Sequence, residues 1–190
     1  MSAFEYTSVL ASIIIGLALV DILISLNRLI RAGGSVRWHW AAPLAALLVA
    51  MTIIQIWWST YSPQDTGMTI GQFLPLLVEL VILFLLAAAA LPDDIPAGGL
   101  DLKLYYDRNG PYFWSLFTAA LGWLIAVEGV ATLAGGRDIG QLLEARLADL
   151  SVLAVFASLI FVRRLWWHAI AFVLLAAGPL NWLSLSLGRL

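Results

Sequence analysis

The sequence contains no cysteine, and only 12% of its 190 residues are charged. Without cysteine, the chain cannot form disulfide bonds, thiolate metal sites or a cysteine nucleophile. Its ten basic residues face twelve acidic ones, so there is no positive surplus for a phosphate backbone and nucleic acid is not an expected partner. Charge this scarce also excludes a disordered chain and an ordinary soluble domain, in which about a quarter of the residues are charged.

Hydrophobic residues are abundant instead, at 62% of the chain, and the mean hydropathy is +0.95. A soluble domain of this size could not hide so much apolar surface behind so few charges. The lipid bilayer is therefore the expected partner. Because lipid cannot hydrogen-bond exposed backbone groups, the expected fold class is all-α, a polytopic membrane helix bundle forming one transmembrane domain over residues 1–190.

Six apolar stretches have about the 20 residues that a helix needs to cross a bilayer core of about 30 Å. They are residues 7–29, 40–60, 69–91, 112–133, 145–162 and 165–187. Six spans also allow a weak three-plus-three repeat of residues 1–91 and 112–190, a plan common among transporters.

Basic residues are distributed unevenly among the connections between these spans. The first, third and fifth connections carry most of them: Arg28, Arg31, Arg37, Lys103, Arg108, Arg163 and Arg164. The positive-inside rule then places these connections in the cytoplasm and both termini on the non-cytoplasmic side. With connections this short, a bacterial inner membrane is the simplest location.

Two connections have local patterns of their own. Apolar alternation over Leu100–Tyr106 predicts a short strand or a segment lying at the membrane interface, and Asn109–Pro111 predicts a turn that starts the fourth span. Asp138 is expected to cap an amphipathic helix before the fifth span. That helix either continues into the span as one long helix, which is the expected arrangement, or lies flat at the interface.

Three carboxylates fall inside predicted spans: Asp21, Glu79 and Glu128. Ionisable side chains are costly to bury in a span, so each is a functional candidate by default. Carboxylates that line a polar path relay protons or bind small cations. The alternatives are that each pairs with a neighbouring polar group and fixes helix packing, or that one lies shallow beside headgroup water.

Polar side chains and prolines accompany these carboxylates within the spans. The expected ion path adds three polar residues to the carboxylates: Gln72, Ser25 and Asn181. Pro75 and Pro179 are expected to kink the third and sixth spans, because a proline inside a helix frees a carbonyl that can face a cavity.

Two histidines, His39 and His168, begin predicted spans within tryptophan-rich strings at the expected cytoplasmic face. They are candidates for pH sensing or for ligation of a haem or metal, although an interface histidine in an aromatic belt is the commoner arrangement. We expect neither a metal site nor a cofactor.

Small residues recur at helical spacing in the first and fourth spans. They are Ser8, Ser12, Gly16, Ser115, Gly122 and Gly129. Such stripes let helix backbones approach closely, either within one chain or between copies. A homo-oligomer is expected because a single bundle of six helices leaves little room for a wide pore.

Enzyme signatures are absent from the sequence: there is no G-x-S-x-G elbow and no H-E-x-x-H pair. The expected function is a small channel or transporter for protons or small cations. The first alternative is a non-catalytic accessory or sensor subunit that works by packing against partners. The second is a lipid-modifying enzyme that uses His39, His168 and the acidic loop at the cytoplasmic face.

Overall fold

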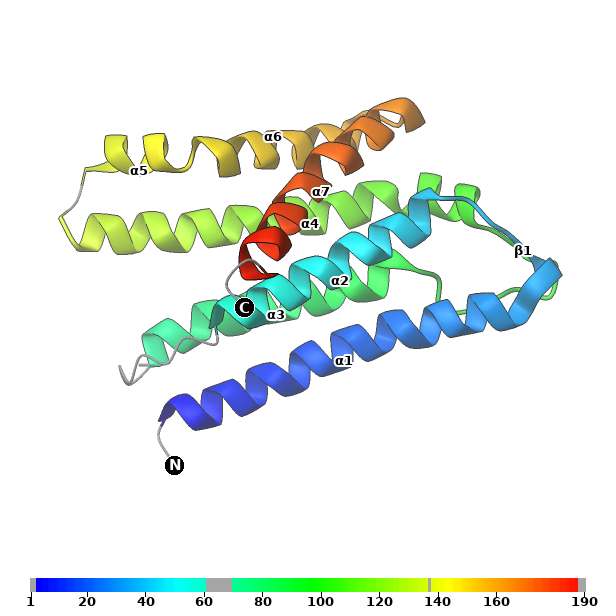
Figure 1. Ribbon diagram of the computed structural model, residues 1–190, viewed down its shortest axis with the longest axis horizontal. Helices are drawn as coiled ribbons and strands as arrows, with labels where there is room; N and C mark the ends of the chain where they lie inside the picture. The colour runs from blue at the N-terminus through cyan, green and yellow to red at the C-terminus, as the bar shows by residue number, and fades with distance from the viewer. Residues whose placement is uncertain (1–2, 61–69, 137, 188–190) are drawn as a thin grey trace.

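The computed structural model describes residues 3–60, 70–136 and 138–187, and these are predominantly helical (Figure 1). The elements follow in the order α1 (Ala3–Ala32), η1 (Gly33–Ser35), β1 (Val36–Arg37), α2 (Ala41–Thr60), α3 (Ile70–Ala90), β2 (Leu100–Asp101), α4 (Leu102–Ala134), α5 (Ile139–Ala145), α6 (Leu147–Phe161) and α7 (Leu165–Leu187). The expected all-α fold class is confirmed.

Four of the described helices, α1 to α4, are long and apolar enough to cross a membrane. Helix α6 and the described part of α7 are apolar but shorter. The 33 residues of α4 extend about 50 Å at 1.5 Å per residue, well beyond a bilayer core of about 30 Å. The helices are thus compatible with membrane insertion, while six crossings stay a prediction.

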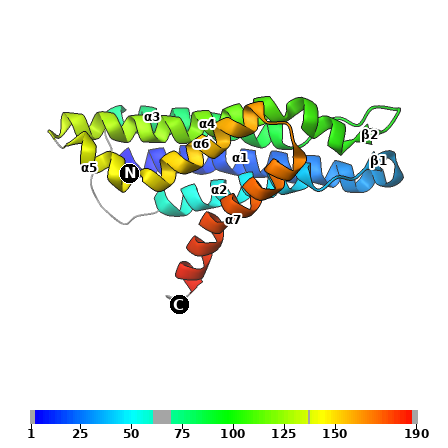
Figure 2. The same ribbon diagram turned by 90° about the horizontal axis from the view of Figure 1, so that it is seen from above.

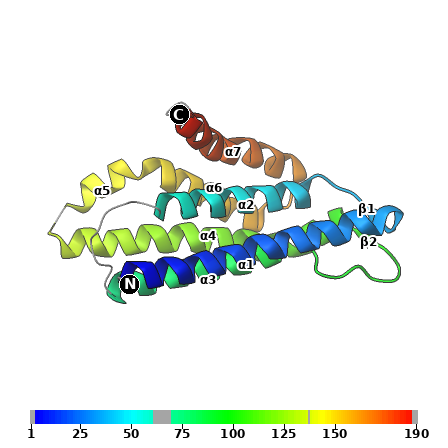
Figure 3. The same ribbon diagram turned by 60° about the horizontal axis from the view of Figure 1, so that its bottom comes forward.

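Helices α1 to α4 lie side by side, and α6 runs along α4 (Figures 1 and 3). Helix α7 leaves this bundle at a steep angle, and it contacts α2 and α6 (Figure 2). Small side chains form much of the buried face of α2, at Ala41, Ala42, Ala45 and Ala46. Small residues at a helix interface let backbones approach closely, which is how helices associate where lipid removes the hydrophobic driving force.

The first, third and fifth connections meet at one end of the bundle. Strand β1 pairs in parallel with β2, with Val36 opposite Leu100. Gly99 is required beside this pairing, because its φ is +88° and a Cβ there would lie 2.9 Å from the carbonyl oxygen of Ser35. His168, just after the fifth connection, is hydrogen-bonded to Tyr106 near the start of α4. The basic residues of these connections therefore gather at one end.

Helix α4 begins earlier than the sequence suggested. The predicted strand is present only at Leu100–Asp101, and the prediction is wrong beyond it. Oδ1 of Asp101 accepts hydrogen bonds from the backbone N–H groups of Lys103 (2.9 Å) and Leu104 (3.1 Å), which caps the helix. Leu102, Tyr106 and Gly110 are buried at a spacing of four, so helical periodicity outweighs the apolar alternation.

Removing the α4 cap by Asp101→Ala should lower the unfolding temperature near neutral pH. The hydrogen bond from Leu104 N–H, then that from Lys103 N–H and the charge of Arg37, hold the pKa of Asp101 below its ordinary value of 3.8. A lowered folded-state pKa gives stabilisation that is complete above the ordinary value and disappears as the pH falls through the folded-state pKa.

Thermal unfolding of wild type and Asp101→Ala across pH checks this expectation. The difference between them should be constant near neutrality and vanish well below pH 3.8. Asp101→Asn is the matched control, because asparagine also caps helices but does not titrate. A difference that persists unchanged into strong acid would show that the carboxylate is not the cap.

The predicted turn at Asn109–Pro111 is also wrong, because these residues lie inside α4. The Asn109 side-chain amide donates to the carbonyl oxygen of Ala89 (2.6 Å) and to Oη of Tyr105 (3.0 Å). Asn109 therefore fastens α4 to the end of α3 instead of closing a turn. Pro111 is tolerated within the helix at the expense of one backbone hydrogen bond.

The segment before the fifth span forms a helix of its own. Oδ1 of Asp138 accepts a hydrogen bond from the backbone N–H of Gly140 (3.0 Å), so the expected cap is confirmed. Arg146 lies between α5 and α6 with φ −106° and ψ 13°, outside the helical region. The expectation of one continuous helix is therefore wrong; a flat position of α5 at the interface stays a prediction.

Candidate functional site

Glu79 lies on α3, which contacts α1, α2 and α4. Glu79 is only 7% exposed, and its Oε2 atom has no hydrogen-bond partner among the described residues. One turn earlier, the carbonyl oxygen of Pro75 accepts a hydrogen bond from Nε1–H of Trp123 (2.9 Å), which ties α3 to α4 beside this carboxylate. Glu79 is thus a carboxylate held inside the bundle without a compensating partner on one oxygen.

A buried carboxylate without a partner cannot remain a bare anion. Desolvation of an isolated charge is far more costly than protonating it or binding a counter-ion. The carboxyl group of Glu79 is therefore a candidate for protonation or for binding a small cation.

Asp21 lies near the end of α3 and not midway along the bundle. The Oγ of Ser25, one turn on and buried, donates a long hydrogen bond to Oδ1 of Asp93 (3.4 Å), just past the last residue of α3. Nη1 of Arg28 donates to the backbone carbonyl of Asp93 (2.7 Å), and Asp21 lies within range of both charges. These contacts favour the shallow alternative for Asp21.

Glu128 is engaged in an ion pair. Its Oε2 lies 2.6 Å from Nη2 of Arg146, whose Nη1 lies 2.7 Å from Asp149. The Glu128 side chain is 38% exposed, so an attraction of this kind contributes about 1 kcal/mol or less. Glu128 therefore fits the alternative in which a carboxylate pairs locally and fixes one helix against the next.

The described contacts do not bring the three carboxylates together. Asp21 lies within range of the charges of Asp93 and Arg28, whereas Glu79 and Glu128 each have separate surroundings. The side chains of Gln72, Pro179 and Asn181 lie outside the described residues. The structure thus leaves Glu79 as the buried carboxylate whose Oε2 has no hydrogen-bond partner among the described residues.

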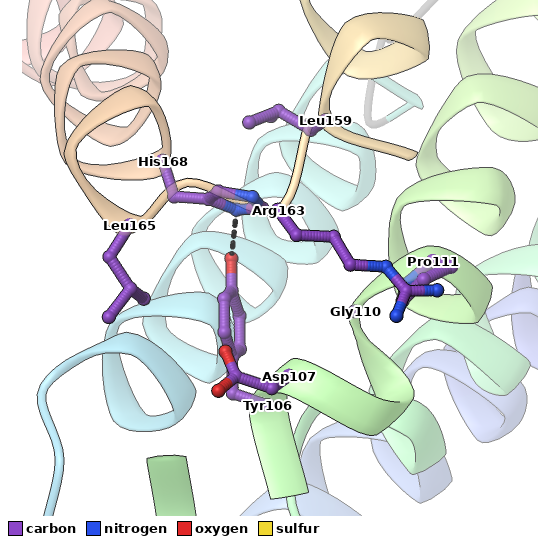
Figure 4. Close-up of a pocket in the computed structure, with 8 residues that line it drawn as sticks. All are labelled: Tyr106, Asp107, Gly110, Pro111, Leu159, Arg163, Leu165 and His168. Carbon is purple, nitrogen blue, oxygen red and sulfur yellow. Dashed lines mark hydrogen bonds between the residues drawn. The ribbon is translucent and has the colours of Figure 1, made fainter. Parts of the chain in front are cut away.

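His168 is the centre of a buried hydrogen-bond chain (Figure 4). Its Nε2 lies 2.7 Å from the carbonyl oxygen of Val162, which can only accept, so Nε2 carries the hydrogen. Nδ1 then accepts from Oη–H of Tyr106 (2.8 Å), and Tyr106 Oη accepts from Nε1–H of Trp114 (3.0 Å). Every ring hydrogen bond is satisfied with a neutral imidazole, which links α4, α7 and the turn before α7.

His39 has a different and more local environment. Its Nδ1 accepts a long hydrogen bond from the backbone N–H of Ala41 (3.4 Å) at the start of α2, and its ring packs against Trp40. The His39 side chain therefore accepts a hydrogen bond from the first turn of α2. A role in pH sensing for either histidine stays a prediction.

An aromatic cluster joins α4, α6 and α7, and the sequence alone did not predict it. Trp114 is fully buried and lies 5.6 Å from Phe117 and 5.8 Å from Phe156 between ring centroids, while Phe117 and Phe156 are 4.8 Å apart. Phe117 follows Phe113 by four positions and Trp114 by three, so the three rings lie on one face of a helix. This spacing was the sequence pattern from which a buried aromatic face could have been predicted.

The small-residue stripes are placed unequally. Ser12 is exposed, and nothing lies within 4 Å of a Cβ built on Gly16. The buried face of α1 consists instead of Ala11, Ile15, Ala18, Ile22, Ser25 and Leu29. Gly122 does face a neighbour, since its Cβ would lie 3.9 Å from Cδ1 of Leu153 on α6. A close-packing role for the stripe on α1 stays a prediction.

No protein-family model, curated protein or solved structure matches this chain. The fold and the site therefore define only the broad structural class of this protein. The chain is a predominantly helical protein whose long apolar helices are compatible with membrane insertion.

Proposed function

We propose that this chain is an integral membrane protein that moves protons or a small cation, with Glu79 as the group that binds them. The observation that carries the proposal is the buried Oε2 of Glu79, which has no partner among the described residues. An apolar residue of similar size at position 79 would give a more stable bundle than a buried carboxylate does. A carboxylate there is therefore not explained by stability alone. Retaining a carboxylate inside the bundle is typical of groups that bind and release ions.

In this proposal α6 and α7 complete six crossings together with α1 to α4, in a bacterial inner membrane. The end that carries β1 and β2 faces the cytoplasm, because the basic residues of three connections gather there. Both termini then face the opposite side. A bundle of this size leaves little room for a wide pore, so a homo-oligomer accompanies the proposal.

The path runs between Glu79 inside the bundle and the shallow group formed by Asp21 and Ser25. Ser25 is buried and hydrogen-bonds to Asp93, so it marks the boundary between the bundle and the polar loop. Glu128 is assigned to helix packing, because Arg146 already offsets its charge.

Flux measurements on the purified chain test the proposal. Reconstituted in proteoliposomes with an imposed membrane potential, it should move protons or a monovalent cation faster than protein-free liposomes. Correctly folded protein that shows no flux for protons, sodium or potassium would contradict the proposal.

A second candidate is a non-catalytic accessory or sensor subunit. The observation favouring it is that Arg146 forms an ion pair with Glu128, and that Asp21 lies within range of the opposite charge of Arg28. Carboxylates engaged in this way fix helix packing and need no permeant ion. Absence of flux together with stable self-association would favour this candidate.

A further inference from the structure

Several basic side chains already have an acidic or carbonyl partner within the chain. They are Arg28, Arg37, Lys103 and Arg146. Arg163 and Arg164 are different: both are exposed, and neither guanidinium has an ion pair or hydrogen bond to any described residue. They are adjacent in the chain, so the turn between α6 and α7 carries two positive charges without an ion-pair partner among the described residues.

The backbone of this turn is held firmly. The backbone N–H of Val162 donates to Ser158 (2.9 Å), and its carbonyl accepts from Nε2 of His168 (2.7 Å). The carbonyl of Arg164 accepts from the backbone N–H of Trp167 (2.9 Å). Because these backbone groups are occupied and His168 is anchored on Tyr106, the two arginines are presented from a fixed position.

Arg163 extends over a small cavity toward Gly110 and Pro111 of α4 (Figure 4). The cavity measures about 10 Å³, close to the volume needed for one water molecule, so it is too small to enclose a phosphate group, which could bind only at its mouth. Asp107 also lines this cavity, but Nζ of Lys103 lies 3.1 Å from its carboxylate and offsets the negative charge.

The surroundings of the turn are apolar and aromatic. Phe161 is 82% exposed and Trp166 58% exposed, on either side of the two arginines, and Tyr112 of α4 is 50% exposed. Exposed aromatic rings next to arginine are typical of the depth at which lipid headgroups meet acyl chains. A free anion in water gains nothing from such neighbours, whereas a phospholipid offers a phosphate and acyl chains together.

We propose that Arg163 and Arg164 bind the phosphate of an anionic phospholipid whose acyl chains lie against Phe161 and Trp166. Guanidinium groups suit this ligand, because they donate two parallel hydrogen bonds to phosphate oxygens. Basic sites between helices at the cytoplasmic interface bind anionic headgroups in the same way. This inference rests on the membrane insertion proposed above, and it is independent of transport through Glu79.

Native mass spectrometry of the full chain, released from nanodiscs of phosphatidylcholine and phosphatidylglycerol, tests the proposal. The wild type should retain phosphatidylglycerol in preference to phosphatidylcholine. The double variant Arg163→Gln/Arg164→Gln should retain several-fold less, and Arg163→Lys/Arg164→Lys an intermediate amount. Arg31→Gln is the matched control, because Arg31 is an exposed arginine at the end of α1 without a partner among the described residues, and it should retain the wild-type amount.

Equal retention by the double glutamine variant and Arg31→Gln would overturn the proposal. So would displacement of the lipid by inorganic phosphate alone, which would identify a site for free anions. Thermal unfolding of each variant in neutral detergent verifies that it is folded. The two proposals are tested separately. If the double glutamine variant loses lipid retention but keeps normal ion flux, transport through Glu79 is unaffected. If the wild type retains the lipid but shows no ion flux, only the transport proposal fails.

Discussion

Glu79→Gln should reduce ion flux in proteoliposomes to the level of protein-free liposomes. Glutamine has nearly the same shape as a protonated glutamate but neither releases a proton nor binds a cation by charge. Because the Glu79 carboxyl group has no partner on Oε2, the substitution breaks no hydrogen bond to that atom. We therefore expect the free energy of unfolding to change by about 1 kcal/mol or less.

Glu79→Leu sharpens this expectation. It too should abolish flux, but it removes a buried oxygen that lacks a partner, so the free energy of unfolding should stay the same or rise by about 1–2 kcal/mol. A variant that is more stable and inactive marks a residue retained for function at the expense of stability. If Glu79 had a purely structural role, Glu79→Leu would instead lower the free energy of unfolding.

Glu128→Gln is the matched control for both variants. It is the same substitution, on α4, at a carboxylate that is 38% exposed and paired with Arg146. We expect nearly normal flux and a loss of about 1 kcal/mol or less. If Glu79→Gln and Asp21→Asn both leave flux unchanged, the assignment of the ion path is wrong.

Trp114→Ala should have the largest effect on stability. Trp114 is fully buried, stacks with Phe117 and Phe156, and donates to the hydroxyl group of Tyr106. Removing a buried tryptophan leaves a cavity and typically costs about 3–5 kcal/mol. Here it also deprives Tyr106 of a donor, so the contact between α4, α6 and α7 should weaken first.

Equilibrium unfolding in detergent, followed by far-ultraviolet circular dichroism, measures this cost. Trp166→Ala is the control, because Trp166 is 58% exposed and its loss should change the free energy of unfolding by about 1 kcal/mol or less. A cost at Trp114 no greater than that at Trp166 would contradict the central place given to the aromatic cluster.

Hydrophobic run length predicted the helices well, because each apolar run is long and uninterrupted. The helices of the structure begin and end within a few residues of the predicted spans, except at the start of α4. Helix α4 starts about ten residues early because Asp101 caps it, and the sequence pattern of that region suited a strand equally well. The break before α6 depends on Arg146, whose side chain reaches back to Glu128 on another helix.

The candidate site could be predicted only in part. Scarcity of charge selected Glu79, since few ionisable residues fall inside spans, but its lack of a partner is a tertiary property. His168 looked like an interface residue because its main partner, Tyr106, is 62 positions away in the chain. Long-range side-chain contacts of this kind leave no periodic signal in a single sequence.

The most direct test of the central claim is infrared difference spectroscopy of the protein in lipid bilayers during a pH titration. A protonated carboxyl group in an apolar environment gives a carbonyl stretching band that an ionised carboxylate lacks. We predict such a band in the wild type at a pH where exposed carboxylates are ionised, its disappearance as the pH is raised further, and its absence over the same pH range in Glu79→Gln. Identical spectra for the wild type and Glu79→Gln in this region would contradict the claim that Glu79 binds and releases a proton inside the bundle.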